Sequence, residues 1–244
     1  MKTIVEIEMW KLKNSKILWI VILVPAFVVA QGVINFIRYH DLFTGKGQNA
    51  WEQLYSQSMI FYVWILFPVL ISLVMTLLAR IENANQNWKH YLSLPVSREK
   101  IYGIKFLIGC ALVLVNVFVL IACMLAAGKV IGVQEDIPYE MIFIQPMAAY
   151  VAALPIMAVL YALSIRFSHM AVPLGVGIGL TVPAMIVANT KYWVVYPWTY
   201  PIMAALGRNI DIFDKGRVIY LIGILLLIRI FRFGCGRFAK KDIV

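Results

Sequence analysis

The chain has 244 residues, of which 62% are hydrophobic and only 14% are charged, and its mean hydropathy is +0.84. A soluble domain is nearer half apolar and a quarter charged, so this composition excludes an ordinary soluble protein. The net charge of +10 does not indicate nucleic-acid binding, because the basic residues lie in the gaps between apolar runs, as they do in loops of membrane proteins. We therefore predict an all-α, polytopic membrane protein whose single transmembrane domain covers residues 1–244.

The N-terminal segment Met1–Lys16 mixes apolar residues with lysines. This pattern predicts a short amphipathic helix at the inner headgroup level, with a frayed tail as the alternative. The segment does not resemble a cleavable signal peptide, because charge is spread through it and the first apolar run is long enough to span.

Six apolar runs follow, and each is a candidate transmembrane helix, since a bilayer crossing needs about twenty mostly apolar residues. The fifth and sixth are the shortest, and their ends are the least certain. The six runs are Ile17–Ile37, Ser58–Ala79, Ile104–Ala127, Phe143–Ile165, Ala171–Asn189 and Val218–Phe233.

The distribution of Lys and Arg predicts that both chain ends are cytoplasmic, with about fifteen basic residues on that side against about seven on the other. In this topology Arg38–Gln57 is an external polar turn and Gly128–Ile142 is an external acidic loop. The short connection Arg166–Met170 makes the fourth and fifth spans antiparallel neighbours. Within the fifth span, alternate glycines at 175, 177 and 179 indicate either close helix packing or simply a lipid-compatible composition.

The connection Thr190–Arg217 is rich in tyrosine and tryptophan and continues into the apolar stretch Ile202–Leu206. Aromatic residues collect at the headgroup level, so one interpretation is a plain aromatic belt. The other is a re-entrant external hairpin that dips into the bilayer and takes part in substrate handling. Its candidate residues are Tyr192, Trp193, Tyr196, Trp198 and Tyr200.

Several kinds of chemistry are missing from the sequence. No Asp or Glu lies within the six apolar runs, which argues against ion-coupled carriers and intramembrane proteases. The three cysteines and three histidines have no metal-ligand spacing, and no phosphate-binding loop motif is present, so we expect no cofactor, no metal and no ATP hydrolysis by this chain. The mild polar residues inside the runs, such as Ser72, Asn116, Ser164 and Thr181, are expected to form hydrogen bonds between helices.

The segment between the second and third runs carries a specific pattern. Residues 85–94 predict a short helix on which Trp88, Tyr91 and Leu92 share one face, and which stops before Pro95. An apolar face on a cytoplasmic loop suits a groove on a partner protein, or it packs against the chain's own helices. The segment Glu82–Lys105 resembles the inner loop of the type-2 ABC exporter permeases, with matching residues Glu82, Leu92, Pro95, Val96, Ser97, Arg98, Ile101, Tyr102 and Lys105.

The resemblance extends to the N-terminal segment, which is similar to the interfacial elbow helix of that family, and to Thr190–Leu206, which is similar to its re-entrant external hairpin. Within the family, the pattern of Glu8, Lys11 and Ser15 and the phrase Tyr196–Tyr200 are most similar to permeases of lantibiotic self-protection. Bacitracin-resistance permeases are similar too.

The resemblance implies a permease subunit in a bacterial cytoplasmic membrane that is not itself an enzyme. Its implied partners are two cytoplasmic ATPase subunits carrying ATP and Mg²⁺, a second permease subunit, identical or paralogous, and an amphipathic peptide substrate in the lipid bilayer. A membrane sensor or scaffold without transport is the alternative from another class. The implied coupling residues are Glu82, Asn85, Trp88, Lys89, Tyr91, Leu92, Pro95 and Arg98.

Overall fold

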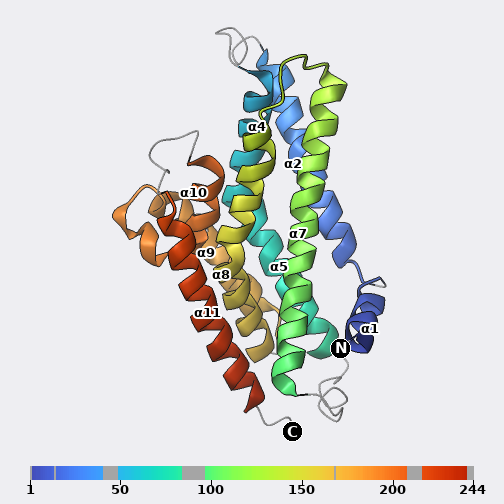
Figure 1. Cartoon of the computed structure of the whole chain (residues 1–244), viewed down its shortest axis with the longest axis vertical. Coiled ribbons are helices and arrows are strands. Elements are labelled where there is room, and N and C mark those ends of the chain that lie inside the picture. The colour runs from blue at the N-terminus through green and yellow to red at the C-terminus, as the bar shows by residue number, and fades with distance from the viewer. Residues whose placement is uncertain are drawn as a thin grey trace.

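The computed structural model describes residues 2–13, 15–40, 49–83, 97–167, 169–207 and 216–240, and their regular elements are all helical. The long helices lie side by side in an elongated bundle, and α1 and the end of α11 lie at the same end of it (Figure 1). The helices are α1 (Lys2–Lys13), α2 (Ile17–Arg38), α4 (Ala50–Phe61), α5 (Phe67–Asn83), α7 (Arg98–Ile131), α8 (Gln145–Arg166), α9 (Ala171–Val187), α10 (Tyr200–Leu206) and α11 (Val218–Ala239).

Five of the described helical stretches are long and apolar enough to cross a membrane, which makes the chain a multi-pass membrane protein. A π-helical turn, Tyr62–Leu66, joins α4 to α5, so the two helices form one continuous rod. Another π-helical turn, Glu140–Ile144, continues directly into α8. The five stretches are Ile17–Arg38, Ala50–Ile81, Arg98–Ile131, Glu140–Arg166 and Val218–Ala239.

The expected fifth span, Ala171–Asn189, is α9, which has 17 residues. At about 1.5 Å per residue it measures roughly 26 Å, slightly less than the roughly 30 Å hydrocarbon core. Six full-length spans were predicted, whereas the described residues form five long apolar helices and one shorter apolar helix. Between α9 and α11 the chain continues through two short 3₁₀ turns, Lys191–Val195 and Pro197–Thr199, and then α10.

Two loop predictions were too long. The expected external turn Arg38–Gln57 contains helix from Ala50 onward, because Asn49 caps the helix by accepting a hydrogen bond from the Trp51 amide. The expected loop Gly128–Ile142 begins later than predicted, since α7 continues to Ile131 and ends at Gly132, which adopts φ +81. Only glycine adopts this left-handed conformation easily, and it is common just after a helix end.

The acidic loop after α7 serves as a cap for α4. The Glu135 carboxylate accepts a hydrogen bond from the Ala50 amide, and its carbonyl accepts one from Trp51 Nε1 at 3.0 Å. A negative charge at a helix N-terminus is favourable because the free amides and the helix dipole point toward it. The Trp51 ring packs where Gly128 has no side chain, since a Cβ there would lie 2.1 Å from the ring. These contacts join α4 to the far end of α7.

Polar groups inside the bundle are paired in two ways. Asn116 on α7 accepts a hydrogen bond from the Tyr62 hydroxyl at 2.6 Å and donates one to the Val21 carbonyl at 2.7 Å. That carbonyl lacks its usual helical donor because the residue four positions later is Pro25, which has no N–H. The prediction of bonds between helices is thus confirmed for Asn116. It is wrong for Ser72 and Thr181, which donate to Pro68 and Gly177 carbonyls of their own helices.

The three glycines of α9 are not equivalent. A Cβ at Gly177 would lie 2.0 Å from Ser72 Oγ and 3.1 Å from Leu160 Cδ2, so α9 approaches α5 and α8 closely at this position. Gly175 and Gly179 have no atom within 4 Å of the corresponding point. Close helix packing therefore explains Gly177, and its two neighbours face away from the contact.

This difference gives a direct test. Replacing Gly177 with leucine should lower the free energy of unfolding by about 2 kcal/mol, because the added side chain has no space against α5 and α8. Gly175→Leu and Gly179→Leu are the matched controls and should leave stability unchanged or slightly higher, since leucine favours helix. Thermal unfolding of the purified variants in detergent measures this, and equal losses at all three positions would contradict the packing argument.

Candidate functional site

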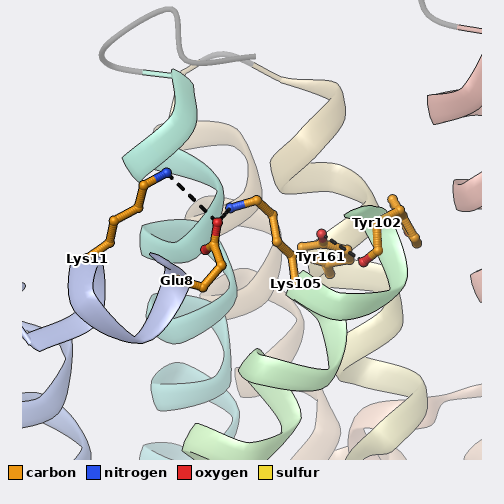
Figure 2. A network of polar contacts seen from close by, with 5 residues as sticks. All are labelled: Glu8, Lys11, Tyr102, Lys105 and Tyr161. Atoms are coloured by element: carbon orange, nitrogen blue, oxygen red, sulfur yellow. Dashed lines mark hydrogen bonds and ion pairs between the residues drawn. The ribbon is translucent and has the colours of Figure 1, made fainter. Parts of the chain in front are cut away.

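A buried ion pair joins α1 to the beginning of α7. Lys105 Nζ donates to Glu8 Oε1 at 2.8 Å, and each side chain is only 2% exposed. Lys11 Nζ, on the next turn of α1, lies 3.8 Å from the same oxygen, so the carboxylate faces two ammonium groups (Figure 2). In the sequence, Glu8 and Lys11 belong to one family-like pattern and Lys105 to another, and nothing in either pattern predicts that they meet.

The pair determines how α1 lies on the bundle. Removing a carboxylate and an ammonium from water costs several kcal/mol for each ion, which only close pairing offsets. Leu12 is buried on the same helix, whereas Met9 and Trp10 are exposed, Trp10 at 73%. The helix thus turns Glu8 inward and its indole outward, as suits a helix whose outer side meets an apolar or headgroup environment.

The first turns of α7 also hold α8 and α11. The Tyr161 hydroxyl of α8 donates to the Tyr102 carbonyl at 3.2 Å, and the two rings lie 4.8 Å apart. Tyr102 also contacts Phe231 and Phe238 of α11, with centroid distances of 5.3 and 5.7 Å. In Figure 2 the Tyr102 ring points away from the ion pair. The start of α7 is therefore a junction, with α1 on one side and α8 and α11 on the other.

The structure describes two of the predicted coupling residues, Glu82 and Arg98, at the two ends of the predicted coupling segment. Glu82 is in the last turn of α5, and Arg98 begins α7, where its guanidinium donates to the Ala239 carbonyl at 3.2 Å. The segment between these two residues connects the end of α5 to the start of α7. The start of α7 in turn contacts α1 and α11. Six of the predicted coupling residues lie outside the described residues: Asn85, Trp88, Lys89, Tyr91, Leu92 and Pro95.

The aromatic segment, defined here as Lys191–Leu206, packs on α9 toward the other end of the bundle. The Tyr196 hydroxyl donates to the Leu180 carbonyl at 2.7 Å, and Trp198 Nε1 donates to the Gly177 carbonyl at 3.3 Å. Within the segment, the Tyr200 hydroxyl donates to the Val194 carbonyl at 2.5 Å. These bonds fold the segment back along the helix that precedes it.

The five predicted aromatic residues differ in exposure. Trp198 and Tyr200 are buried, Trp193 packs edge-on against Tyr200, and Tyr192 is 62% exposed. Burial raises the pKa of Tyr200 to about 12, so its hydroxyl stays protonated and able to donate near neutral pH. The structure therefore gives Trp198 and Tyr200 a packing role and leaves Tyr192 available at the surface.

The aromatic segment also contacts α4. The Tyr55 hydroxyl of α4 donates to the Ala205 carbonyl of α10 at 3.0 Å, and both residues are buried. Among the described residues, no group of three or more His, Cys, Asp or Glu side chains could hold a metal ion. The aromatic segment and the part of α4 that it contacts offer aromatic surface and hydrogen bonds.

The sequence contained a signal for the ion pair that composition alone did not use. Lys105 is the second residue of the apolar run Ile104–Ala127, and a charged residue in such a run needs a partner. Glu8 stands in a segment expected to be surface-exposed. Which of the acidic residues would meet Lys105 depends on how α1 folds back on α7, and this is tertiary information.

Comparison with known proteins places the chain in a family. The model of the family described as ABC-2 family transporter protein matches residues 4–184, about three quarters of the chain, from α1 through most of α9. No curated protein and no solved structure matches the chain.

Breaking the ion pair should release α1. Glu8→Gln removes the carboxylate that faces the buried Lys105 ammonium and should destabilise the docked helix by roughly 3 kcal/mol. Lys105→Met leaves Glu8 only the more distant Lys11 and should destabilise it less. The double variant Glu8→Met/Lys105→Met removes both charges and should recover most of this loss. Glu6→Gln, at an exposed position of the same helix, is the control. Tryptic cleavage at Lys13 in detergent reports the release, and unchanged cleavage in both single variants would contradict the docking role.

Removing the hydroxyl of Tyr196 should loosen the aromatic segment. Tyr196→Phe keeps the ring but loses the bond to α9, which should raise the free energy of the folded segment by about 1 kcal/mol. Tyr192→Phe is the matched control at an exposed ring of the same segment. Hydrogen exchange of the backbone amides in residues 191–206 measures the change, and identical exchange in the two variants would contradict this assignment.

Proposed function

The chain belongs to the ABC-2 family of transporter proteins and is a membrane permease subunit, and from this premise we propose that it removes an amphipathic antimicrobial peptide of the lantibiotic class from a bacterial cytoplasmic membrane. The family implies an ATPase subunit as partner, because the chain has no phosphate-binding loop of its own. ATP and Mg²⁺ then bind to that partner.

One observation carries the proposal: the buried Glu8–Lys105 pair beside the predicted coupling loop. A loop that receives a push from an ATPase can move helices only if its ends are firmly attached to them. At one end Glu82 belongs to α5. At the other, Arg98 and Lys105 fix α7 to α11 and α1. The attachment supports a role of Glu82, Asn85, Trp88, Lys89, Tyr91, Leu92, Pro95 and Arg98 in ATPase contact.

The aromatic segment is the proposed substrate region. Aromatic side chains offer a large apolar surface with a polar tip, which suits a peptide that lies at the membrane interface. Tyr192 and Val195 are exposed, and buried Trp198 and Tyr200 hold the segment in place. We further propose that two permease subunits, identical or paralogous, act with two ATPase subunits, and that both chain ends face the cytoplasm.

The function is tested by survival. The permease is coexpressed with its candidate ATPase in a sensitive bacterium and challenged with a panel of lantibiotics, with bacitracin as the alternative substrate class. We expect the complex to raise the lethal dose of at least one lantibiotic. Equal sensitivity with and without the complex, at verified expression in the membrane, would exclude peptide protection.

The coupling role is tested separately in the same assay. Trp88→Glu and Leu92→Glu place a charge on the face proposed to enter the ATPase groove, so they should abolish both protection and association with the ATPase. Glu6→Gln, outside the loop, should retain both. Loss of protection with intact ATPase association would move the role of these residues away from the ATPase contact.

A further inference from the structure

A pocket of about 440 Å³ lies between α7, α8 and α11, at the end of the bundle that holds α1. Its volume falls within the roughly 300–1,000 Å³ of small-molecule sites. The walls are mainly apolar, with Val159 and Leu163 from α8 and Ile230 and Phe233 from α11. Its described lining residues include none from the aromatic segment.

Two arginines stand at the ends of the helices that form the pocket. Arg166 is the last residue of α8, and Arg237 lies in the last turn of α11. The guanidinium of Arg237 lies 4.6 Å from the centre of the Phe233 ring, and that of Arg166 lies 5.4 Å from the Phe167 ring. Such cation–π contacts hold exposed guanidinium groups in position, so less freedom is lost when a ligand binds.

A buried polar atom at the pocket wall has no hydrogen-bond partner among the residues that the structure describes. It is the hydroxyl of Tyr102, a residue that is 1% exposed. It packs above Gly234, where a Cβ would lie 2.3 Å away. A buried hydroxyl without a partner costs roughly 1–3 kcal/mol, so such groups call for an explanation. A ligand oxygen that reached the glycine side of the pocket would supply the acceptor.

The outer side of this region has the character of a lipid-facing surface. On α11, Leu225 is 68% exposed and Phe233 is 61% exposed. The helix is long and apolar enough to span a membrane, where such side chains would face lipid. Arginines at the ends of such helices lie at headgroup level, where they extend toward phosphate groups. Basic pockets between transmembrane helices on one side of the membrane are a known type of phospholipid headgroup site.

From these observations we propose that the pocket between α7, α8 and α11 binds one anionic phospholipid. An acyl chain fills the apolar cavity, the phosphate lies between Arg166 and Arg237, and an ester or glycerol oxygen accepts from Tyr102. Charge decides between this occupant and an apolar face of a second copy. Two arginines at the mouth would remain unpaired against an apolar helix, whereas an anionic headgroup neutralises them.

The site is independent of the peptide export proposed above, so its test uses binding alone. The purified full-length chain is titrated in detergent with phosphatidylglycerol, and bound lipid is counted by native mass spectrometry. Phosphatidylcholine, of equal chain length, tests the need for net negative charge. We expect one phosphatidylglycerol to bind per chain at concentrations where phosphatidylcholine does not, and inorganic phosphate alone not to displace it, because the acyl chain contributes to binding.

The variants separate the three parts of the site. Arg166→Gln/Arg237→Gln should weaken phosphatidylglycerol binding roughly thirtyfold, at about fivefold for each arginine near a lipid phosphate. Ala162→Leu, which reduces the cavity, should weaken both lipids, and Tyr102→Phe should weaken binding without changing the preference for the anionic lipid. Arg232→Gln is the matched control, an exposed arginine of α11 that does not line the pocket.

Three results would overturn the proposal. Equal binding of the two lipids would remove the headgroup site, and displacement by millimolar phosphate would reduce it to a simple anion site. A chain that dimerises through α11 and binds no lipid, with dimerisation lost in Ala162→Leu, would show that a second copy covers the pocket.

Discussion

The pairing of Glu8 with Lys105 is the interaction on which the arrangement of this end of the bundle depends. Both charges are buried, so each depends on pairing with an opposite charge for its stability there. Among the side chains of α1 that the structure describes, Leu12 is the buried hydrophobic one. The Glu8 carboxylate, which Lys11 also approaches, adds an ion pair to this apolar contact and so helps to give α1 a defined position. α7 begins at Arg98, seven residues before Lys105, so the same pair also helps to hold the first turns of α7.

In the rest of the bundle, polar groups in apolar surroundings form hydrogen bonds with one another. Pro25 leaves a carbonyl of α2 without its usual helical donor, and Asn116 donates to this carbonyl while it also accepts from Tyr62. This links α2, the π-helical turn and α7 at one point inside the bundle. The hydroxyls of Ser72 and Thr181 donate to carbonyls of their own helices, and α5 and α9 approach each other closely at Gly177. Polar pairing and close packing thus occur at neighbouring positions of the same helices.

The sequence predicted the helical class, the position of the long helices and the resemblance to the family that the comparison then identified. These follow from local patterns: apolar run length, loop charge and one loop motif. It failed where the outcome depends on contacts between distant segments. Ala50–Gln57 was predicted to be part of a polar loop, but it is a helix that is capped locally by Asn49 and also by Glu135, which is 85 residues away. Gly177 could not be distinguished from Gly175 and Gly179 until α5 and α8 were placed beside α9.

The same reasoning explains why the functional residues were found only in part. Trp198 and Tyr200 stood out as aromatic residues, but composition does not reveal that they are buried supports while Tyr192 is exposed. Glu8 and Lys105 were noticed in separate patterns, and pairing them requires α1 to fold back onto α7. Pocket-lining Tyr102 was noted as a motif residue, whereas its lack of a hydrogen-bond partner is visible only with α11 in place.

The long helices connect these features mechanically. α7 has 34 residues, or roughly 51 Å, and is therefore longer than a hydrocarbon core of about 30 Å. At one end it begins at Arg98, and the loop after its other end caps α4 through the bonds of Glu135 to Ala50 and Trp51. The rod formed by α4 and α5 ends at Asn83, and the chain then leads to the start of α7. The α4–α5 rod and α7 are therefore connected at both ends, and Tyr55 links α4 to α10. On the coupling role proposed above, a movement of α4 and α5 would reach the aromatic segment through Tyr55, whose hydroxyl donates to the Ala205 carbonyl.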